Sequence, residues 1–353
     1  MVLKLRSSYS KEDVILLLKD ITGMVEPKST KEREKLIQMG RHYCEMLPIE
    51  YSPSEQYMEA YKEALKNYAK PTANAIGCLA DEVIAKRGKD VVLVSLARAG
   101  IPVGILLKRY IKWKYKIEVF HYSISIIRGK GIDKNAIQYI LKHHKAENIL
   151  FVDGWIGKGA ILNELEKDMK EFPNISSELA VVADPANITK LCGTHQDILI
   201  PSSCLNCTVS GLISRTFLRE DIIKDKDFHG AVYYEELKER DMSYEFIEAI
   251  QREFELVNRP DDTAPEQKGM KEVTAIAEKF GIDNINFVKP GIGEATRVLL
   301  RRVPWKVLIR EEYKDDISLK HIIRLAEEKN VPVEYYPLKN YKACGIIKKV
   351  ADI

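Results

Sequence analysis

Short apolar runs alternate with helix-like segments between residues 90 and 200, and this alternation restricts the fold more than any other property of the chain. The clearest run, DVVLVSLA at 90–97, is rich in β-branched residues and is typical of a strand buried on both faces. Further strands are predicted at 117–124, 148–153 and 177–183, and a fifth is predicted to begin at 198–200. Helical spacing of apolar residues occupies the segments 102–112, 134–144 and 159–171. The alternation predicts a parallel sheet with right-handed crossovers, which is an α/β fold.

The first 90 residues are predicted to form helices that precede this sheet. Apolar residues recur at three- and four-residue spacing in 11–19, 32–47 and 54–66. Pro71 is expected to end the third helix, because proline lacks the N–H that the helix ladder needs. A further helix, rich in Ala, Leu and Ile, is expected at 73–86.

A polar stretch separates the sheet region from a second α/β pattern. The string RPDDTAPE at 259–266 holds two prolines and four charges, which is typical of a linker. Beyond it, helices are predicted at 270–280, 293–302 and 318–330, and strands at 286–289, 306–310 and 333–336. The chain therefore divides into a first domain at 1–255, a linker at 256–269 and a second domain at 270–353. A length of 353 residues agrees with two domains at about 150 residues each.

The composition excludes several classes of protein. Hydrophobic residues make up 45% and charged residues 30%, as in globular domains rather than disordered chains. No uncharged apolar stretch reaches the ~18 residues of a membrane span, and the start MVLKLRSSYS has no signal-peptide core. Six cysteines in a chain of this length indicate reduced thiols, and a cytoplasmic location is expected.

Positive charge is concentrated near the C-terminal end. The whole chain carries a net charge of +3, but residues 289–353 hold 14 Lys and Arg against 9 Asp and Glu. A basic second domain beside a nearly neutral first domain favours a polyanionic partner for the second domain.

Three of the predicted strand ends carry residues suited to anion binding, and ligands of open parallel sheets bind at the carboxyl ends of strands. The strand at 90–97 runs into a turn of small residues with one cation, formed by Arg98, Ala99 and Gly100. The strand at 117–124 leads to a glycine-flanked loop with two cations, Arg128 and Lys130. We expect this loop to be mobile.

The third strand end combines a carboxylate with a glycine-rich turn. Asp153 ends the strand at 148–153, and a helix follows the turn formed by Gly157, Lys158, Gly159 and Ala160. Backbone N–H groups freed at a helix N-terminus make a cradle for phosphate. A P-loop and a dinucleotide-binding fingerprint are excluded, because G-K-[ST] and G-x-G-x-x-G are both missing.

In this order, the three strand ends resemble the type I phosphoribosyltransferase fold, whose members bind 5-phosphoribosyl 1-pyrophosphate with Mg²⁺. The resemblance implies that residues 97–100 hold pyrophosphate and that Arg128 and Lys130 cover the transition state. It further implies that Asp153 and residues 157–160 hold the ribose and its 5-phosphate. The second of two adjacent acids usual in that family is replaced by Gly154, and Lys158 would supply charge to the phosphate.

Longer strings resemble a narrower bacterial family associated with tellurium resistance and stress. They include VSLARAGIPVGILLKRY at 94–110, HYSISIIRGKGID at 121–133, FVDGWIGKGAI at 151–161 and IPSSCLNCTVSGLISRT at 200–216. The resemblance covers residues 8–255. That family is described both as phosphoribosyltransferase-like and as the StiP type of cysteine protease.

The second description implies a thiolate nucleophile with a histidine base and an orienting acid. Cys204 and His229 are the candidates, with Asp227 or Asp241 as the acid. A buried structural role for Cys204 is the alternative interpretation.

The strings FVKPGIGEATRVLLRRVPWKVLIREE at 287–312 and DISLKHIIRLAEEKNVPVEYYPL at 316–338 resemble the Pelota-type RNA-binding fold. In that fold a glycine-rich strand-to-helix turn and nearby basic residues grip kinked RNA. The resemblance covers residues 270–353 and implies RNA contacts for Gly291, Gly293, Glu294, Arg297, Arg301 and Arg302. A solvated basic face without a ligand is the alternative.

The sequence therefore favours a two-domain α/β enzyme. The first domain, phosphoribosyltransferase-like with N-terminal helices, would use phosphoribosyl pyrophosphate and Mg²⁺ on an unknown acceptor. Arg98, Arg128 and Lys130 would stabilise the leaving pyrophosphate. The small second domain would bind RNA or a related nucleotide. Two alternatives stay open: a cysteine peptidase centred on Cys204, and a nucleotide- or RNA-binding stress protein without catalysis.

Overall fold

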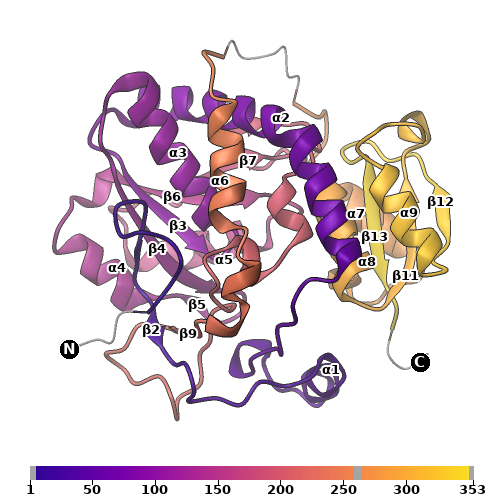
Figure 1. The fold of residues 1–353 in the computed structure, drawn as a ribbon, viewed down its shortest axis with the longest axis horizontal. Coiled ribbons are helices and arrows are strands. Elements are labelled where there is room, and N and C mark those ends of the chain that lie inside the picture. Colours follow the sequence, from indigo (N-terminus) through magenta and orange to yellow (C-terminus); the bar gives the residue numbers. More distant parts are fainter. Residues whose placement is uncertain (1–4, 258–263, 350–353) are drawn as a thin grey trace.

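A parallel sheet forms the centre of the larger part of the molecule in the computed structural model, which describes residues 5–257 and 264–349 (Figure 1). In spatial order its strands are β1 (Ile15–Leu16), β4 (Phe120–Ile127), β3 (Val92–Ala97), β6 (Ile149–Trp155), β7 (Leu179–Ala183) and β8 (Leu191–Thr194). All these neighbours are parallel, and β5 (Gly131–Ile132) pairs antiparallel with β4. The predicted α/β fold is confirmed.

Helices cover both faces of this sheet, because its strands are apolar on both sides. One face is covered by α2 (Glu55–Arg87), α3 (Gly100–Tyr115) and α6 (Ser243–Arg252), and the other by α4 (Lys134–Leu141) and α5 (Ala160–Asp168). Within β6, Leu150 and Val152 belong to the first apolar cluster, whereas Phe151 belongs to the second. Burial on both sides accounts for the uninterrupted apolar runs in the sequence.

The expected helix at 11–19 is wrong. This segment is extended, since β1 pairs with β4 and β2 (Lys19–Asp20) pairs with β9 (Gly230–Ala231). The pairing covers the edge of β4 and places Val14 in one apolar cluster and Leu17 in the other. The expected helix at 32–47 is shorter in the structure: α1 spans Thr30–Gln38, and a 3-10 turn, η1, follows at Tyr43–Glu45.

One long helix replaces the two expected on either side of Pro71. α2 runs unbroken from Glu55 to Arg87 with Pro71 inside it. Proline removes a ladder hydrogen bond, but its neighbours Ala69 and Ala73 are buried in the core. Tertiary packing therefore outweighs the local preference, and α2 reaches from the large sheet to the C-terminal part of the molecule (Figure 1).

The fifth strand also lies elsewhere than expected. β8 occupies Leu191–Thr194, whereas residues 198–200 continue into a 3-10 turn, η4, at Pro201–Cys204. β8 is short and contains a glycine, so its sequence has little strand character. Gly193 is required because a Cβ at this position would lie 2.1 Å from the backbone oxygen of Ala75 in α2.

Residues 264–349, here called the C-terminal unit, contain a second and smaller sheet together with three helices. In spatial order its strands are β10 (Val288–Pro290), β13 (Ala343–Ile347), β11 (Pro304–Ile309) and β12 (Val333–Tyr335). Its helices are α7 (Gly269–Lys279), α8 (Ile292–Arg301) and α9 (Lys320–Glu328). The expected small α/β unit is confirmed, but β13, which pairs with both β10 and β11, is missing from the predicted strands.

Three further observations concern the linker, the helices and the short 3-10 turns. The predicted linker at 256–269 includes residues 258–263, which lie outside the described residues. None of the helices within the described ranges is long and apolar enough to cross a bilayer. Short 3-10 helices occur at Ala146–Asn148, Met169–Glu171, Cys207–Val209 (η5), Glu235–Arg240, Ile285–Phe287 (η7) and Glu311–Tyr313.

A buried acid holds the C-terminal unit over the carboxyl end of the large sheet. Asp197, which follows β8, accepts the N–H of Ile292 at 3.0 and 3.1 Å and the N–H of Lys342 at 2.9 Å. Burial raises the pKa of Asp197 to about 6, although these N–H groups act in the opposite direction. Ile292 begins α8, so the carboxylate lies where the helix dipole favours negative charge. Apolar packing completes the joint, since Leu299 of α8 and Ile200 share one cluster.

Asp197→Ala is expected to destabilise this joint. Hydrogen bonds to a charged acceptor contribute about 1.5–3 kcal/mol, and the variant leaves two buried N–H donors without one. We expect urea unfolding, followed by circular dichroism, to show a loss of about 3 kcal/mol. Asp225→Ala removes an exposed acid and is the control, with an expected change below about 0.5 kcal/mol. Wild-type stability in Asp197→Ala would show that apolar packing alone holds the unit in place.

Candidate functional site

The strand order reverses between β3 and β6, and the region at the carboxyl ends of these two strands is here called the crevice. These neighbouring strands are followed by helices on opposite faces of the sheet, α3 after β3 and α5 after β6. Open α/β sheets bind ligands in the crevice that such a reversal leaves. Two of the three predicted anion-binding turns follow these two strands, so the fold brings those turns together.

The turn after β3 approaches β6 very closely. Gly100 begins α3, and a Cβ at this position would lie 2.4 Å from a backbone oxygen of β6. Glycine alone permits this approach. Arg98 already has protein partners: its guanidinium donates to Ile213 O at 2.9 Å and to Asn206 Oδ1 at 3.2 Å, and it lies 3.6 Å from Glu50. The predicted pyrophosphate contact of Arg98 would compete with these three groups.

The turn after β6 presents unused backbone donors. Gly159 has φ +86° and precedes the first residue of α5, a conformation that favours glycine. The N–H groups of residues 157–160 have no acceptor among the described residues. The ammonium of Lys158 donates to Ile285 O at 2.7 Å and to Val288 O at 3.3 Å, both in the C-terminal unit. The turn thus has the donors that a phosphate cradle needs.

Asp153 is a partly buried carboxylate in the same crevice. Burial raises its pKa to about 6, while the N–H of Gly154 at 2.8 Å and the charge of Arg297 act to lower it. A Cβ at position 154 would lie 3.6 Å from Ala99 O, so close packing does not require the glycine that replaces the second acid. Perturbed carboxyl groups in crevices are a common feature of functional sites.

The C-terminal unit places its glycine-rich turn against the turn at 157–160. Tyr341 donates its hydroxyl to Gly157 O at 2.6 Å. The guanidinium of Arg297 lies 4.6 Å from the ring centroid of Trp155 and 3.1 Å from Glu294. A small cavity between these elements has room for about one water molecule. The crevice is therefore bordered by residues of both parts of the chain.

Most of the predicted RNA-binding residues consequently face inward. Gly291 and Gly293 are buried at the boundary with the first domain, and Arg301 donates to backbone oxygens of residues 203–205. Burial, together with Arg297, lowers the pKa of Arg301. Arg302 is exposed. The glycine-rich turn of the C-terminal unit thus contacts protein, not open solvent.

The loop expected to be mobile is a tight hairpin turn at residues 128–130, between β4 and β5. Protein contacts hold its backbone: Arg128 N donates to Tyr43 Oη at 3.1 Å, and Gly129 N donates to Glu164 Oε2 at 2.6 Å. These contacts give the turn a defined position beside the crevice.

The two cations of this hairpin point to different places. Arg128 donates to Asn286 Oδ1 of the C-terminal unit at 2.9 Å. Lys130 instead borders a separate groove of about 880 Å³, together with Asp133 and His229. The structure therefore places Arg128, and not Lys130, with Lys158 at the boundary between the two parts.

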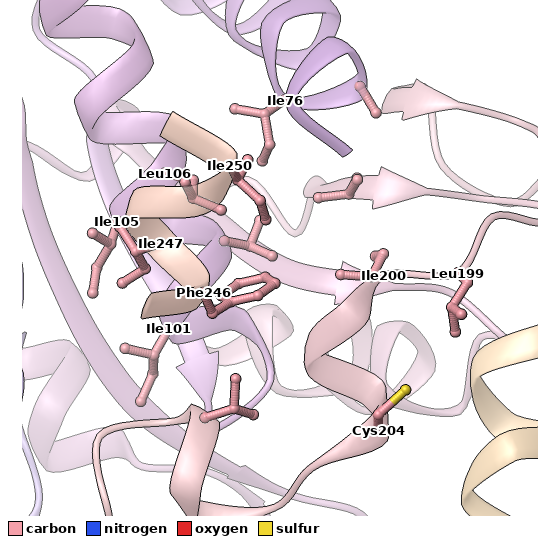
Figure 2. Close-up of a cluster of buried hydrophobic side chains, with 14 of the residues drawn as sticks. Ile76, Ile101, Ile105, Leu106, Leu199, Ile200, Cys204, Phe246, Ile247 and Ile250 are labelled. Carbon is pink, nitrogen blue, oxygen red and sulfur yellow. The ribbon is translucent and has the colours of Figure 1, made fainter. Parts of the chain in front are cut away.

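Cys204 and His229 make no contact with each other in the described part of the chain. Cys204 lies in the same apolar cluster as Leu199 and Ile200 (Figure 2), and burial raises the pKa of its thiol to about 12. His229 Nδ1 lies 2.8 Å from Ser125 Oγ. The backbone N–H of His229 donates to a carboxylate oxygen of Asp133. This geometry gives Cys204 the features of a buried structural residue.

A cysteine–histidine contact does occur near the hairpin. Cys44 Sγ lies 2.9 Å from His42 Nδ1, and His42 Nε2 lies 3.2 Å from Arg128 O. Cys44 is fully buried, and burial raises the pKa of its thiol to about 11. Because a nucleophilic cysteine needs an accessible thiolate, this pair also lacks the properties of a peptidase centre.

Lys289 is a residue of the crevice that sequence reasoning missed. It lies in β10 directly before the Pro290–Gly291 turn, and its charge lowers the pKa of Lys158 across the boundary. The sequence does contain a signal that could have identified Lys289. It is a cation at a strand end before a glycine-containing turn, the same pattern that identifies Arg98. No group of three or more His, Cys, Asp or Glu side chains within 5–257 and 264–349 is placed to hold a metal ion.

Comparison with known proteins matches two family models to this chain. Residues 7–251 match the family described as tellurite-like stress resistance cysteine protease StiP, and residues 267–349 match the PELOTA RNA binding domain. A protein of Acinetobacter baylyi (strain ATCC 33305 / BD413 / ADP1), described as cysteine protease StiP, is 34% identical over 364 residues. The similarity covers 97% of this chain and 94% of that protein.

Solved structures of phosphoribosyltransferases align with the chain at low similarity. A hypoxanthine-guanine phosphoribosyltransferase of Bacillus anthracis aligns at 16% identity and a TM-score of 0.23, covering 38% of this chain and 71% of that one. The hypoxanthine phosphoribosyltransferase of Trypanosoma cruzi aligns at 15% identity and a TM-score of 0.26. The alignment covers 55% of this chain and 99% of that one. The family model and the Acinetobacter relative together show that the chain belongs to the family of the tellurite-like stress resistance cysteine protease StiP.

Proposed function

We propose that this protein is an enzyme that transfers phosphoribose from phosphoribosyl pyrophosphate to an acceptor in the crevice between β3 and β6. The observation that carries the proposal is the turn at 157–160, whose N–H groups lack acceptors among the described residues. This turn includes Lys158. Together with Asp153, whose pKa is raised by burial, it lies at the point where the strand order reverses. Unused N–H groups at a helix start, a cation and a carboxylate suit a phosphorylated sugar.

The proposed transfer exchanges one bond at C1 of the ribose. The bond from C1 to the pyrophosphate oxygen breaks, a bond from C1 to the acceptor forms, and the acceptor proton passes to water. Pyrophosphate leaves with the bonding electrons, and Lys158 and Arg128 would stabilise its charge. Asp153 is ionised above its pKa of about 6 and would accept hydrogen bonds from ribose hydroxyls.

Asp153 and Glu294 would hold Mg²⁺ that is bound to the pyrophosphate. Mg²⁺ in proteins usually takes one or two carboxylates, substrate phosphates and several waters. The charge of Glu294 acts with burial to raise the pKa of Asp153, as expected of two carboxylates that lie near each other. This donor set fits Mg²⁺ together with a phosphate ligand, and the bound ion would supply charge neutralisation of the leaving group.

A cysteine peptidase is the second candidate, because the family and the Acinetobacter relative carry that description. Cys204 is a poor nucleophile in this structure, since it is 2% exposed and its pKa is raised to about 12 by burial. RNA binding is a third candidate, since residues 267–349 match the PELOTA RNA binding domain. Each of these activities predicts a different result in the experiments below.

Lys158→Ala is expected to weaken binding of phosphoribosyl pyrophosphate with Mg²⁺. The loss of a charge-assisted contact to phosphate corresponds to about a tenfold to 100-fold lower affinity. Isothermal calorimetry on the full chain measures it. Tyr341→Phe is the matched control, since it removes a neighbouring hydrogen bond to Gly157 O without removing charge. Absence of binding to the wild type would reject the proposal, and equal losses in both variants would assign the effect to a loosened boundary.

Asp153→Asn is expected to stabilise the protein at neutral pH. The folded pKa is raised, so the folded state holds the proton more tightly, and stability falls as pH rises from about 4 to about 6. The side-chain amide of the variant does not ionise, so the variant does not lose this stability as the pH rises. We expect a gain of about 1–2 kcal/mol at pH 7.5 and almost none at pH 3.5, measured by thermal unfolding. An equal effect at both pH values would mean that Asp153 is not perturbed, while weaker ligand binding in the same variant would support its role.

Cys204 is expected to resist alkylation in the native protein. With the pKa of its thiol at about 12, only about one molecule in 10⁵ carries the thiolate at pH 7. We expect mass spectrometry after brief iodoacetamide treatment to find Cys204 unmodified, and to find it alkylated after treatment in guanidinium chloride. Rapid stoichiometric alkylation of native Cys204, accompanied by loss of a peptidase activity, would favour the peptidase instead.

A further inference from the structure

We propose that Lys289 and Arg297 of the C-terminal unit bind the pyrophosphate group of the ligand together with Lys158 and Arg128 of the first domain. The site is thus shared by the two parts of the chain, and the first domain alone lacks half of its cations. This inference takes the identity of the ligand from the function proposed above.

The segment at residues 285–289 gathers the cations of both parts. Lys158 donates to Ile285 O at 2.7 Å and to Val288 O at 3.3 Å, and Arg128 donates to Asn286 Oδ1 at 2.9 Å. Lys289 is the next residue of the same segment. Two cations of the first domain therefore bind to a segment of five residues that itself carries the third cation, Lys289.

The groups that hold these cations are neutral. Lys158 is bound by two backbone carbonyls and Arg128 by a side-chain amide, so neither contact compensates charge. Burial, with Lys289 and Arg128 nearby, lowers the pKa of Lys158 to about 8. Burial also lowers the pKa of Lys289, with Arg128 and Arg297 acting in the same direction and Glu294 opposing them. Like charges held together in partly buried positions are costly without an anion to share.

Arg297 adds a fourth cation that carries an unused donor. Its guanidinium lies over Trp155 and donates to Glu294 through Nη1. Its Nε is buried and has no acceptor among the described residues. Buried polar groups almost always have a partner, and an oxygen of a bound ligand would supply one here. The charge of Arg297 also reaches Asp153 in the crevice.

The surroundings favour a small anion over a nucleic acid. Lys158, Lys289 and Arg297 are half-buried, whereas Arg128 is exposed, so the cluster has an inner part and an outer edge. The adjacent turn at 291–293 is buried against the first domain, so this turn is not exposed to kinked RNA. Bidentate guanidinium groups and point-like ammonium groups together suit the closely spaced oxygens of a pyrophosphate.

The test is calorimetric titration of the full chain with inorganic pyrophosphate, and then with phosphoribosyl pyrophosphate and Mg²⁺. Lys289→Ala and Arg297→Ala should each weaken binding of inorganic pyrophosphate by about tenfold or more. Arg324→Ala is the matched control, because it removes one positive charge and an ion pair with Glu63 that joins α9 to α2 at 3.5 Å. This control should bind as the wild type does, and thermal unfolding should show all three variants folded.

The outcomes separate this inference from the function on which it rests. Unchanged affinity in Lys289→Ala and Arg297→Ala, with a loss in Lys158→Ala, would overturn the shared site and leave the proposed transfer standing. Loss in all three variants, without binding of phosphoribosyl pyrophosphate to the wild type, would support the shared site and reject the transfer. Loss of structured-RNA binding in Arg297→Ala, with pyrophosphate affinity unchanged, would assign the residue to RNA and overturn the inference.

Discussion

The contact between Asp197 and the first turn of α8 determines what the carboxyl end of the large sheet can do. Its carboxylate accepts the N–H groups of Ile292 and Lys342 and so fixes α8 over the crevice. In an open α/β sheet without such a covering unit, a turn like that at 157–160 would border solvent. With it, the same turn lies beside cations and a carboxylate from the other part of the chain. The C-terminal unit therefore borders the candidate site directly, through contacts with Gly157 and Lys158.

Burial of charged groups at this boundary costs stability. Asp153 and Asp197 are both held with a raised pKa, and Lys158 with a lowered one, because burial disfavours their charged forms. Asp197 recovers part of this cost through hydrogen bonds to backbone donors. Asp153 has one such donor, the N–H of Gly154, and Lys158 is held by two neutral carbonyls, a pattern more typical of function than of folding.

The elements that sequence reasoning mispredicted are those whose conformation is imposed by distant partners. The segment at 11–19 has helical spacing but is extended, because the exposed edge of β4 offers it hydrogen bonds. Pro71 lies within an unbroken α2, because buried neighbours hold the helix together. β8 and β13 are short and contain glycine. β13 becomes a strand through pairing with β10 and β11, which are remote in sequence, and β8 through pairing with β7 beneath the distant helix α2. Local preference carries no record of such contacts.

The sequence by itself determined the alternation of strands and helices, the two α/β parts, and the glycine-rich turns that follow β3 and β6. These follow from residue periodicity and from the backbone freedom of glycine, which are local properties. Only the tertiary structure decided that Arg128 and Lys130 diverge, that Cys204 and His229 lie apart, and that Lys289 joins Lys158. Those facts depend on which surfaces the C-terminal unit buries, and burial is a property of the whole packed molecule, which no single segment encodes.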